Sequence, residues 1–423
     1  MLRFYIKGLF RDRSRSLMPV IVVAIGVTLV VLMHAWVTGV LGDMINFNAR
    51  FATGHVKVMS RAYSENIDQK PNDLALLGSD QVLEQLSGEY PEMEWVERIQ
   101  FGGLIDAPDQ QGETRAQGPA GGMAVDLLSP GSREVERLNL QKAIIRGRLP
   151  QQPEEILLSE EFATRLEVDP GDPVTLIGTT MYGAMSITNF TVSGTVKFGA
   201  KALDRGGMVA DITTIRQALD MQDAVGEILG YLPGGEYMDE KASEIAAGFN
   251  EKYSDPEDEF SPVMMSLKNQ GTMLMILDLV DYFKSIIIGV FVVAMSIVLW
   301  NSGLLGGLRR YGEMGLRMAI CEEKNHIYRS LITESVFIGL AGSLIGTAFG
   351  LLFASLLSRG IDISDMMQGS TMMMQSVMKA RITPDAYYIG FIPGILATVL
   401  GTALAGIGIY KRKTAQLFKE LQA

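Results

Sequence analysis

The sequence predicts an α-helical membrane domain of four transmembrane helices, with a large extracytoplasmic α/β domain inserted between helices 1 and 2. Four segments contain no Asp, Glu, Lys or Arg, and each is long enough to cross a hydrocarbon core of ~30 Å as a helix rising ~1.5 Å per residue. About 240 residues of mixed composition separate the first two segments, enough for a folded domain. The four segments are Leu17–Leu41, Ser285–Leu308, Ser335–Ser358 and Ala386–Tyr410.

The distribution of charge predicts the orientation of these helices. The segments 1–16, 309–329 and 411–423 together hold 14 basic residues and 5 acidic ones. The stretch 42–284 holds 20 Lys and Arg against 39 Asp and Glu. Because positively charged segments stay on the cytoplasmic side of a membrane, we expect both termini and the 309–329 link to face the cytoplasm.

The chain divides into nine predicted segments. Residues 1–16 mix apolar and basic residues, which suits either an amphipathic helix along the inner leaflet or a basic stop before the span. A signal peptide is a poor alternative for Leu17–Leu41, because the segment is too long for an h-region and no small-residue cleavage site follows it. The predicted order is a cytoplasmic amphipathic segment (1–16), transmembrane helix 1 (17–41), an extracytoplasmic, periplasmic α/β domain (42–273), a stalk with transmembrane helix 2 (274–308), a cytoplasmic coupling link (309–329), transmembrane helix 3 (330–358), a Met-rich periplasmic link (359–385), transmembrane helix 4 (386–410) and a cytoplasmic tail (411–423).

The large domain is acidic, which argues against nucleic acid as a partner. The only cysteine, Cys321, falls on the cytoplasmic side, so the domain must rely on an apolar core instead of disulfides. Short strand-like and helix-like runs alternate along it and predict a mixed α/β fold in two lobes. Strands are expected at His55–Met59, Glu155–Ser159, Val174–Ile177, Thr188–Val196 and Met208–Ile212, a helix at Glu160–Leu166, and loops at Gln110–Gly122 and Ser254–Asp258.

Two segments at the ends of the second span favour mechanical coupling between the outer domain, the membrane helices and a cytoplasmic partner. Leu274–Lys284 repeats apolar residues every three to four positions, which predicts that the second span continues outward as a helical stalk. In the cytoplasmic link, Glu313 and Arg317 are four residues apart, the favourable order for a helical ion pair. This predicts a short amphipathic docking helix, and a solvated basic loop is the alternative. Its candidate residues are Glu313, Met314, Gly315, Leu316, Arg317 and Ala319.

Glycines in the third span recur at every fourth residue, at Gly342, Gly346 and Gly350. This spacing lets a neighbouring helix approach closely. Packing within one chain is the first interpretation, and a seam between two subunits is the alternative.

The outward link is rich in methionine. Thioethers adapt to irregular apolar surfaces, and they also bind Cu(I). We therefore weigh a membrane-interface helix, contact with acyl chains and a copper site. No cysteine is expected on that side, and His34, His55 and His326 are too far apart in sequence to form a metal site, so we predict none. The candidate lipid contacts are Met372, Met373, Met374 and Met378.

The run RRYGEMGLRMAICEEKNHIYRSLITESVFIGLAGSLIGTAFG resembles the signature region of the MacB/LolC/LolE/FtsX family of ABC transporter permeases. That family shows Glu, Gly, Arg and Ala at the spacing of Glu313, Gly315, Arg317 and Ala319, followed by a membrane helix with an acidic residue and many glycines. Cys321 stands near the place of the motif's last Gly, a small departure. Two further segments are similar to the family's extracytoplasmic domain. They are 147–176, which begins GRLPQQPEE, and 52–63, which reads ATGHVKVMSRAY. The resemblance is closest to LolC/LolE-like subunits.

The resemblance implies a permease in the bacterial inner membrane that works as a dimer with a second permease subunit, identical or related. Two copies of a separate ABC ATPase would bind ATP and Mg²⁺ and dock on the 309–329 links. This chain has no Gly-x-x-x-x-Gly-Lys-Ser/Thr loop, so we expect neither an ATPase site nor a cofactor in it. The implied task is extraction of lipoproteins from the inner membrane. The alternatives are MacB-like export with a periplasmic adaptor and FtsX-like regulation of an envelope hydrolase.

Overall fold

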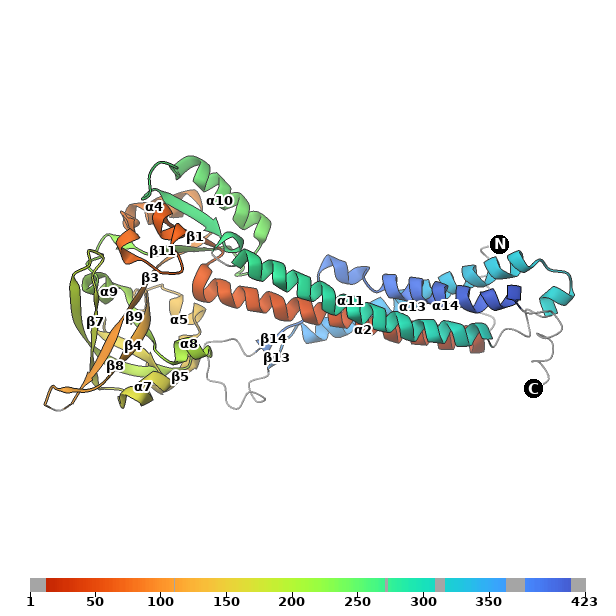
Figure 1. Cartoon of the computed structure of the whole chain (residues 1–423), viewed down its shortest axis with the longest axis horizontal. Helices are drawn as coiled ribbons and strands as arrows, with labels where there is room; N and C mark the ends of the chain where they lie inside the picture. The colour runs from red at the N-terminus through yellow and green to blue at the C-terminus, as the bar shows by residue number, and fades with distance from the viewer. Residues whose placement is uncertain (1–12, 110, 271–272, 309–315, 363–376, 412–423) are drawn as a thin grey trace. The chain divides into compact units, whose positions relative to one another are not determined.

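The computed structural model describes residues 13–109, 111–270, 273–308, 316–362 and 377–411 (Figure 1). The chain forms two compact units. The helical unit comprises Met1–Gly42, Leu279–Ile361 and Met378–Ala423, and the sheet unit comprises Asp43–Asp278 and Asp362–Val377.

Long apolar helices make up the helical unit. They are α2 (Arg13–Asn48), which passes by connectivity into the sheet unit, α11 (Met273–Leu308), α13 (Lys324–Leu357) and α14 (Phe391–Lys411). In the described part of the chain, three helical stretches are long and apolar enough to cross a membrane, namely Leu17–Thr53, Lys324–Leu357 and Pro384–Leu404. The expected second span is helical as part of α11, and a total of four spans stays a prediction.

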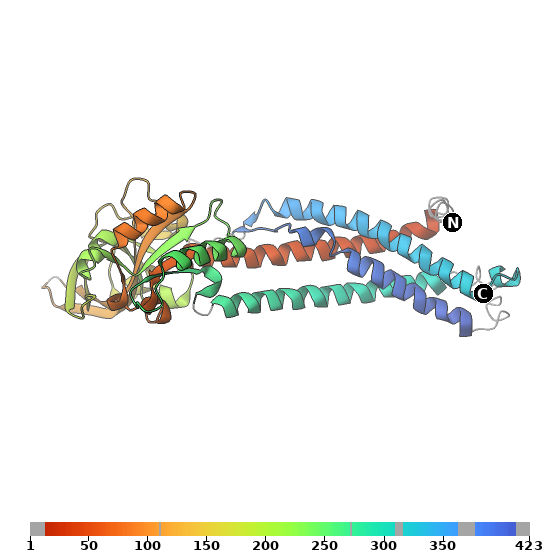
Figure 2. The same cartoon turned by 90° about the horizontal axis from the view of Figure 1, so that it is seen from above.

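The helix α13 packs along α14, and the two lie side by side in both views (Figure 2). A 3-10 turn, η4 (Pro384–Tyr387), precedes α14. The short strands β13 (Ile361–Asp362) and β14 (Val377–Met378) pair with each other at the two ends of the Met-rich link.

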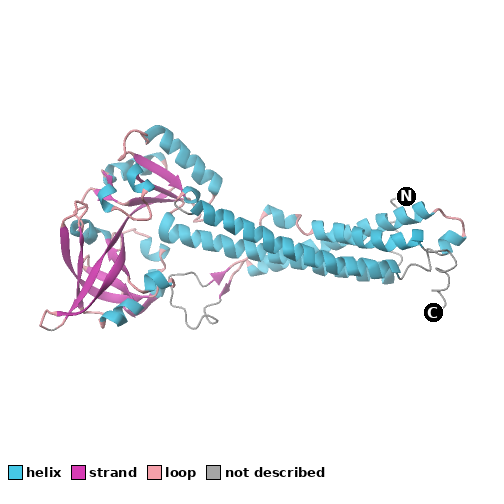
Figure 3. Ribbon diagram, in the orientation of Figure 1, coloured by secondary structure: helices cyan, strands magenta, loops and turns pink. Residues whose placement is uncertain are grey.

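Strand pairing closes six strands of the sheet unit into a ring. Figure 3 shows the strands of this unit in magenta. Going around it, β3 pairs with β4, β4 with β9, β9 with β6, β6 with β8, β8 with β7, and β7 again with β3. The ring strands are β3 (Glu94–Pro108), β4 (Thr114–Val125), β6 (Glu155–Ser159), β7 (Pro173–Thr179), β8 (Met185–Val196) and β9 (Gly207–Asp211), and β5 (Ile144–Gly147) adds to β8.

The 15-residue strand β3 belongs to two lobes at once. Its second part pairs with β4 in the ring, and its first part pairs with β11 (Glu227–Tyr231) of a smaller sheet. That sheet continues through β1 (Val56–Ser60) to β12 (Pro262–Ser266). The strands β2 (Leu76–Leu77) and β10 (Ala224–Val225) form a separate pair.

Short helices cover both lobes. The remaining elements are the π-helix η1 (Ala49–Thr53), α3 (Arg61–Glu65), η2 (Asn72–Leu74), α4 (Ser79–Glu89), α5 (Glu134–Arg137), α6 (Leu140–Ala143), α7 (Glu160–Leu166), α8 (Lys201–Asp204), α9 (Ile212–Ala218), α10 (Asp239–Tyr253) and η3 (Leu267–Asn269).

The expected strands and the helix at 160–166 all appear, with ends shifted by a few residues at most. The expected loop at Gln110–Gly122 is wrong, because most of it is strand β4. This strand carries Gly and Ala where another strand would carry large apolar residues, and a Cβ at Gly118 would lie 2.9 Å from the Phe162 ring. The small residues of β4 make room for aromatic rings from other elements. The apolar packing of this strand is therefore supplied by those rings, and its own sequence shows no alternation of apolar and polar residues.

Candidate functional site

Glycines allow three helices of the helical unit to pack with their main chains in close contact. A Cβ on Gly346 would lie 2.5 Å from the Ala24 carbonyl oxygen of α2, and one on Gly342 would lie 2.6 Å from Val23. Gly350 faces Val31 in the same way. The predicted stripe of Gly342, Gly346 and Gly350 thus lies against α2 of the same chain.

The same contact involves a hydroxyl group. Thr28 of α2 donates to the carbonyl of Gly346 at 3.0 Å and to that of Ala24 at 2.7 Å. On the other side of α13, a Cβ on Gly339 would lie 2.9 Å from the Gly394 carbonyl of α14. Close approach and a shared hydroxyl are what favour helix association in lipid.

The segment 379–383, which we call the strap, crosses α2 in backbone contact. Arg381 donates its main-chain N–H to the Ala35 carbonyl at 2.9 Å, and a Cβ on Gly39 would overlap the Lys379 carbonyl oxygen. His34 and Thr383 are joined at 3.2 Å between Nε2 and Oγ1. The strap therefore fixes the end of the Met-rich link to the helical unit.

The Met-rich link is described only at its ends. Met372, Met373 and Met374 lie outside the described residues, and Met378 lies in β14. The expected interface helix is not helical at this described end, because residues 377–378 pair as a strand and the strap follows.

The predicted docking helix is described only in its second half. Glu313, Met314 and Gly315 lie outside the described residues, whereas Leu316, Arg317 and Ala319 belong to a helical turn over 316–319. Arg317 Nε lies 4.0 Å from Glu322 Oε2, so its nearest described carboxylate follows it in sequence. The expected pair with Glu313 stays a prediction.

We call α2 with its continuation η1 the first stalk helix, and α11 the second stalk helix. Their ends in the sheet unit meet at a place we call the stalk root, residues 45–55, 265–270 and 273–277. Ala49 of η1 and Leu267 of η3 are both fully buried and belong to one apolar cluster. Gln270, which precedes α11, donates its side-chain amide to the Thr53 carbonyl at 3.1 Å. Tyr237 donates its main-chain N–H to Asn46 Oδ1 at 3.1 Å. The ends of the first and second stalk helices are therefore held together by direct contacts within the sheet unit.

A buried guanidinium holds the end of the first stalk helix. Arg98 of β3 is fully buried, and it donates to the Phe51 carbonyl at 2.5 Å and to the Arg50 carbonyl at 2.9 Å. Its Nε donates to Glu134 Oε2 at 2.9 Å. The Tyr231 hydroxyl accepts from Arg98 at 3.2 Å and donates to the Arg50 carbonyl at 3.2 Å. We call these three side chains, Arg98, Glu134 and Tyr231, the clamp.

The clamp belongs to a row of alternating charges. Glu227 is registered opposite Arg98 across β11 and β3, and its Oε1 lies 2.9 Å from Lys57 Nζ in a second buried ion pair. Burial lowers the pKa of Lys57, and Glu227 partly offsets this effect. The row runs through Lys57, Glu227, Arg98, Glu134, Arg137, Glu94 and Arg133.

His55 belongs to the stalk root and is fully buried. Its ring lies edge-on to Tyr231 and Tyr237, with centroids 5.6 and 6.0 Å away. Burial, with the positive charges of Arg50 and Arg137, lowers the pKa of His55 to about 4. The imidazole is therefore neutral at pH 7 and acts as a packing and hydrogen-bonding group.

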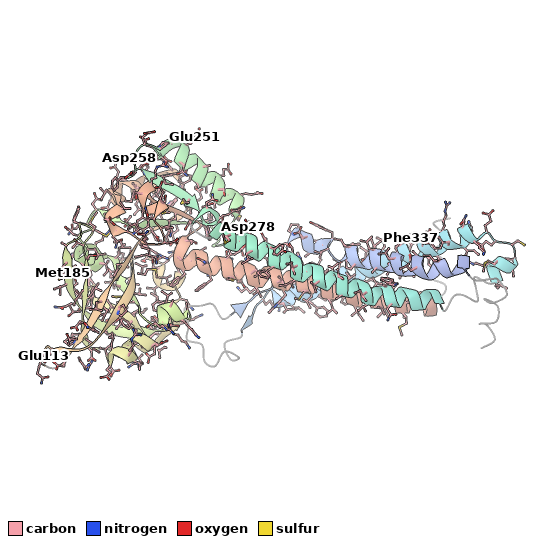
Figure 4. All side chains as sticks on the ribbon, in the orientation of Figure 1. Glu113, Met185, Glu251, Asp258, Asp278 and Phe337 are labelled. Carbon is pink, nitrogen blue, oxygen red and sulfur yellow. The ribbon has the colours of Figure 1, made fainter. Side chains whose placement is uncertain are left out.

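An apolar strip lies on the outer wall of the ring of strands. Ile187, Ile177, Leu104 and Pro119 are neighbours in register across β8, β7, β3 and β4. Ile187 and Met185 are 64% and 75% exposed, and Figure 4 shows Met185 at the surface. Such a strip suits contact with another apolar surface. No pattern within one strand predicts this strip, because its residues become neighbours only when four strands are in register.

The stalk root was not predicted from the sequence either. Arg98 directly follows Glu97 in the mixed segment 94–100, so its neighbours in sequence give no signal of a buried cation. Its partners come from Phe51 and from Tyr231, which lie far away in sequence.

Comparisons with known proteins match both units. The family model described as the MacB-like periplasmic core domain matches residues 16–247, more than half of the chain. The model described as the FtsX-like permease C-terminal matches residues 285–414.

Two curated relatives are the lipoprotein-releasing system transmembrane proteins LolC of Xylella fastidiosa, strains Temecula1 / ATCC 700964 and 9a5c. They are 28% and 27% identical to this chain over 248 residues, which is 56% of this chain and 54% of each relative. The chain thus spans about half the length of the curated relatives it matches. Among solved structures, the periplasmic region of MacB from Actinobacillus actinomycetemcomitans aligns with a TM-score of 0.36 and 11% identity, covering 55% of this chain and 96% of that one.

Proposed function

The chain belongs to the MacB/LolC/FtsX family of ABC transporter permeases, and from this premise we propose that it extracts lipoproteins from the bacterial inner membrane. The observation that carries the choice of substrate is the similarity to LolC, whose name states lipoprotein release. A separate ABC ATPase, in two copies, would supply ATP hydrolysis with Mg²⁺. A second permease subunit, identical or related, would complete the membrane assembly.

The structure supports a mechanical form of this function. Both stalk helices end at one root in the sheet unit, where Ala49 packs on Leu267 and Gln270 bonds to Thr53. A change in one helix must therefore reach the base of the other. The sheet unit would lie in the periplasm and move when the ATPase closes.

The docking surface for the ATPase is proposed on the cytoplasmic link. Arg317 is 44% exposed in its side chain and stands at the family's motif position. Leu316 and Ala319 share its helical turn. With Glu313, Met314 and Gly315, these residues would form the coupling helix. We place acyl-chain contact on the Met-rich link, at Met372, Met373, Met374 and Met378.

The test is purification of the tagged chain from native membranes in mild detergent, followed by mass spectrometry. We expect an ABC ATPase, a permease and acylated lipoproteins. An Arg317→Glu variant should lose the ATPase, and Arg359→Glu, a charge reversal far from the motif, should keep it. An ATPase with a periplasmic adaptor or an envelope hydrolase, and without lipoproteins, would move the function to MacB-like export or FtsX-like regulation. Absence of any ATPase would overturn the proposal.

A further inference from the structure

The carbonyl groups at the end of a helix normally lack partners, and they carry partial negative charge. At the end of the first stalk helix, the carbonyls of Arg50 and Phe51 are met by the buried cation of Arg98. No apolar side chain could replace these bonds. The clamp therefore joins the main chain of this helix end to two strands of the sheet unit, β3 through Arg98 and β11 through Tyr231.

A buried ion pair such as that of the clamp is an unfavourable choice for a purely structural role. Burying an ion pair costs desolvation free energy, and well-packed apolar residues of similar volume are often equally stabilising. Arg98 and Glu134 both have fully buried side chains. Their placement is explained by what Arg98 also binds, because the guanidinium is a rigid fork that can hold a carboxylate and two carbonyls together.

We propose that Arg98 is the positioning residue that makes the sheet unit follow the first stalk helix, and that the clamp serves coupling more than folding. The coupling role rests on the proposed transport function, whereas the contacts of Arg98 with the helix end do not depend on it. Without the clamp, η1 would still be covalently attached and packed through Ala49, but its end could rotate against the sheet.

The chain contains a matched control. Lys57 and Glu227 form another buried ion pair in the same lobe, 2.9 Å apart and with side chains 4% and 2% exposed. This pair has no described bond to the helix end. The double variant Arg98→Met/Glu134→Leu removes the clamp pair, and Arg137, which also pairs with Glu134, keeps its ion pair with Glu94. Lys57→Met/Glu227→Leu removes the control pair in the same way.

The first experiment measures stiffness at the joint. Spin labels are placed at Met44 on α2 and Glu251 on α10, both exposed, in full-length protein with Cys321→Ser. Pulsed electron paramagnetic resonance then gives the distribution of distances between them. We expect a narrow distribution in the parent and the control pair variant, and a broad one in the clamp variant. Tyr231→Phe, which removes only a hydroxyl group, should broaden it less.

A narrow distribution in the folded clamp variant would overturn the inference, as would equal broadening in the control. Tyr231→Phe keeps the test decisive if the double variant does not fold, because no broadening there would also count against the clamp. This measurement uses no ATPase and no substrate. Its result is therefore separate from the co-purification test of the proposed function.

The second experiment measures coupling in the complex reconstituted with its ATPase. We expect the clamp variant to retain basal ATP hydrolysis and to lose ATP-dependent release of lipoprotein. Arg98→Lys, which keeps the charge but not the fork, should restore only part of the release. Full release by a clamp variant with a loosened joint would refute the coupling role.

Discussion

The carbonyl oxygen of Ala24 in α2 lies 2.5 Å from where a side chain would begin on Gly346 in α13. The neighbour is main chain, so it cannot turn aside as a flexible side chain would. The two helices are held at a distance that only glycine permits at this position.

Gly346→Ala should therefore separate the helices and lower the midpoint of thermal unfolding in detergent, at a cost of about 1–3 kcal/mol from overpacking. The matched control is Gly289→Ala in α11, where an added Cβ meets no heavy atom within 4 Å. An unchanged midpoint for Gly346→Ala would show that α2 and α13 do not pack as described.

The strap gives a prediction for amide exchange. Gly39→Ala places a methyl group on the Lys379 carbonyl oxygen, so the strap must leave α2. The N–H of Arg381, now bonded to Ala35, should then exchange with deuterium much faster. Hydrogen exchange with mass spectrometry on residues 379–383 tests this, again with Gly289→Ala as control. Equal protection in Gly39→Ala would contradict the contact.

The ring of strands gives a prediction for paired substitutions. A Cβ on Gly122 of β4 would overlap the ring of Phe101, whereas one on the neighbouring Gly121 would meet nothing within 4 Å. Gly122→Ala should destabilise the protein by about 1–3 kcal/mol, and Gly121→Ala should be nearly neutral. Phe101→Ala alone should cost about 3–5 kcal/mol.

Combining Gly122→Ala with Phe101→Ala should cost less than the sum of the two, because the methyl group then enters the space left by the ring. Chemical denaturation of the four proteins measures the coupling. Strict additivity would mean that the two residues do not touch.

His55 makes stability depend on pH. Its pKa is about 4 in the folded protein and 6.5 ordinarily, so the unfolded chain binds more protons between these values. The free energy of unfolding should therefore fall as the pH falls from 6.5 to 4, by up to about 3 kcal/mol.

His55→Asn should remove much of this slope, because an amide oxygen can still accept from the N–H of Leu232 but does not titrate. His326→Asn is the control, since that side chain is 55% exposed. Unfolding followed at several pH values checks the prediction. An equal slope in the parent and His55→Asn would assign the pH dependence to other groups.

Much of the architecture could be predicted from the sequence because it depends on local composition. Segments such as Leu17–Leu41 are long and free of Asp, Glu, Lys and Arg, and strands such as Glu155–Ser159 are indicated by their own residues. The strand β4 could not be predicted, since its apolar surroundings come from Phe101 and Phe162 on other elements. The prediction of an interface helix for the Met-rich link was also wrong at its described end, where β14 pairs with β13.

By itself, the sequence determined the helical segments, the likeness to a permease family and the glycine stripe, because hydropathy, motif and spacing are properties of neighbouring residues. Only the tertiary structure decided what each of these meets. It placed Gly346 on Ala24, closed six strands into a ring, and brought Arg98 to the end of a helix 47 residues earlier in the chain. Such contacts depend on the register and packing of distant segments, and no local pattern encodes them.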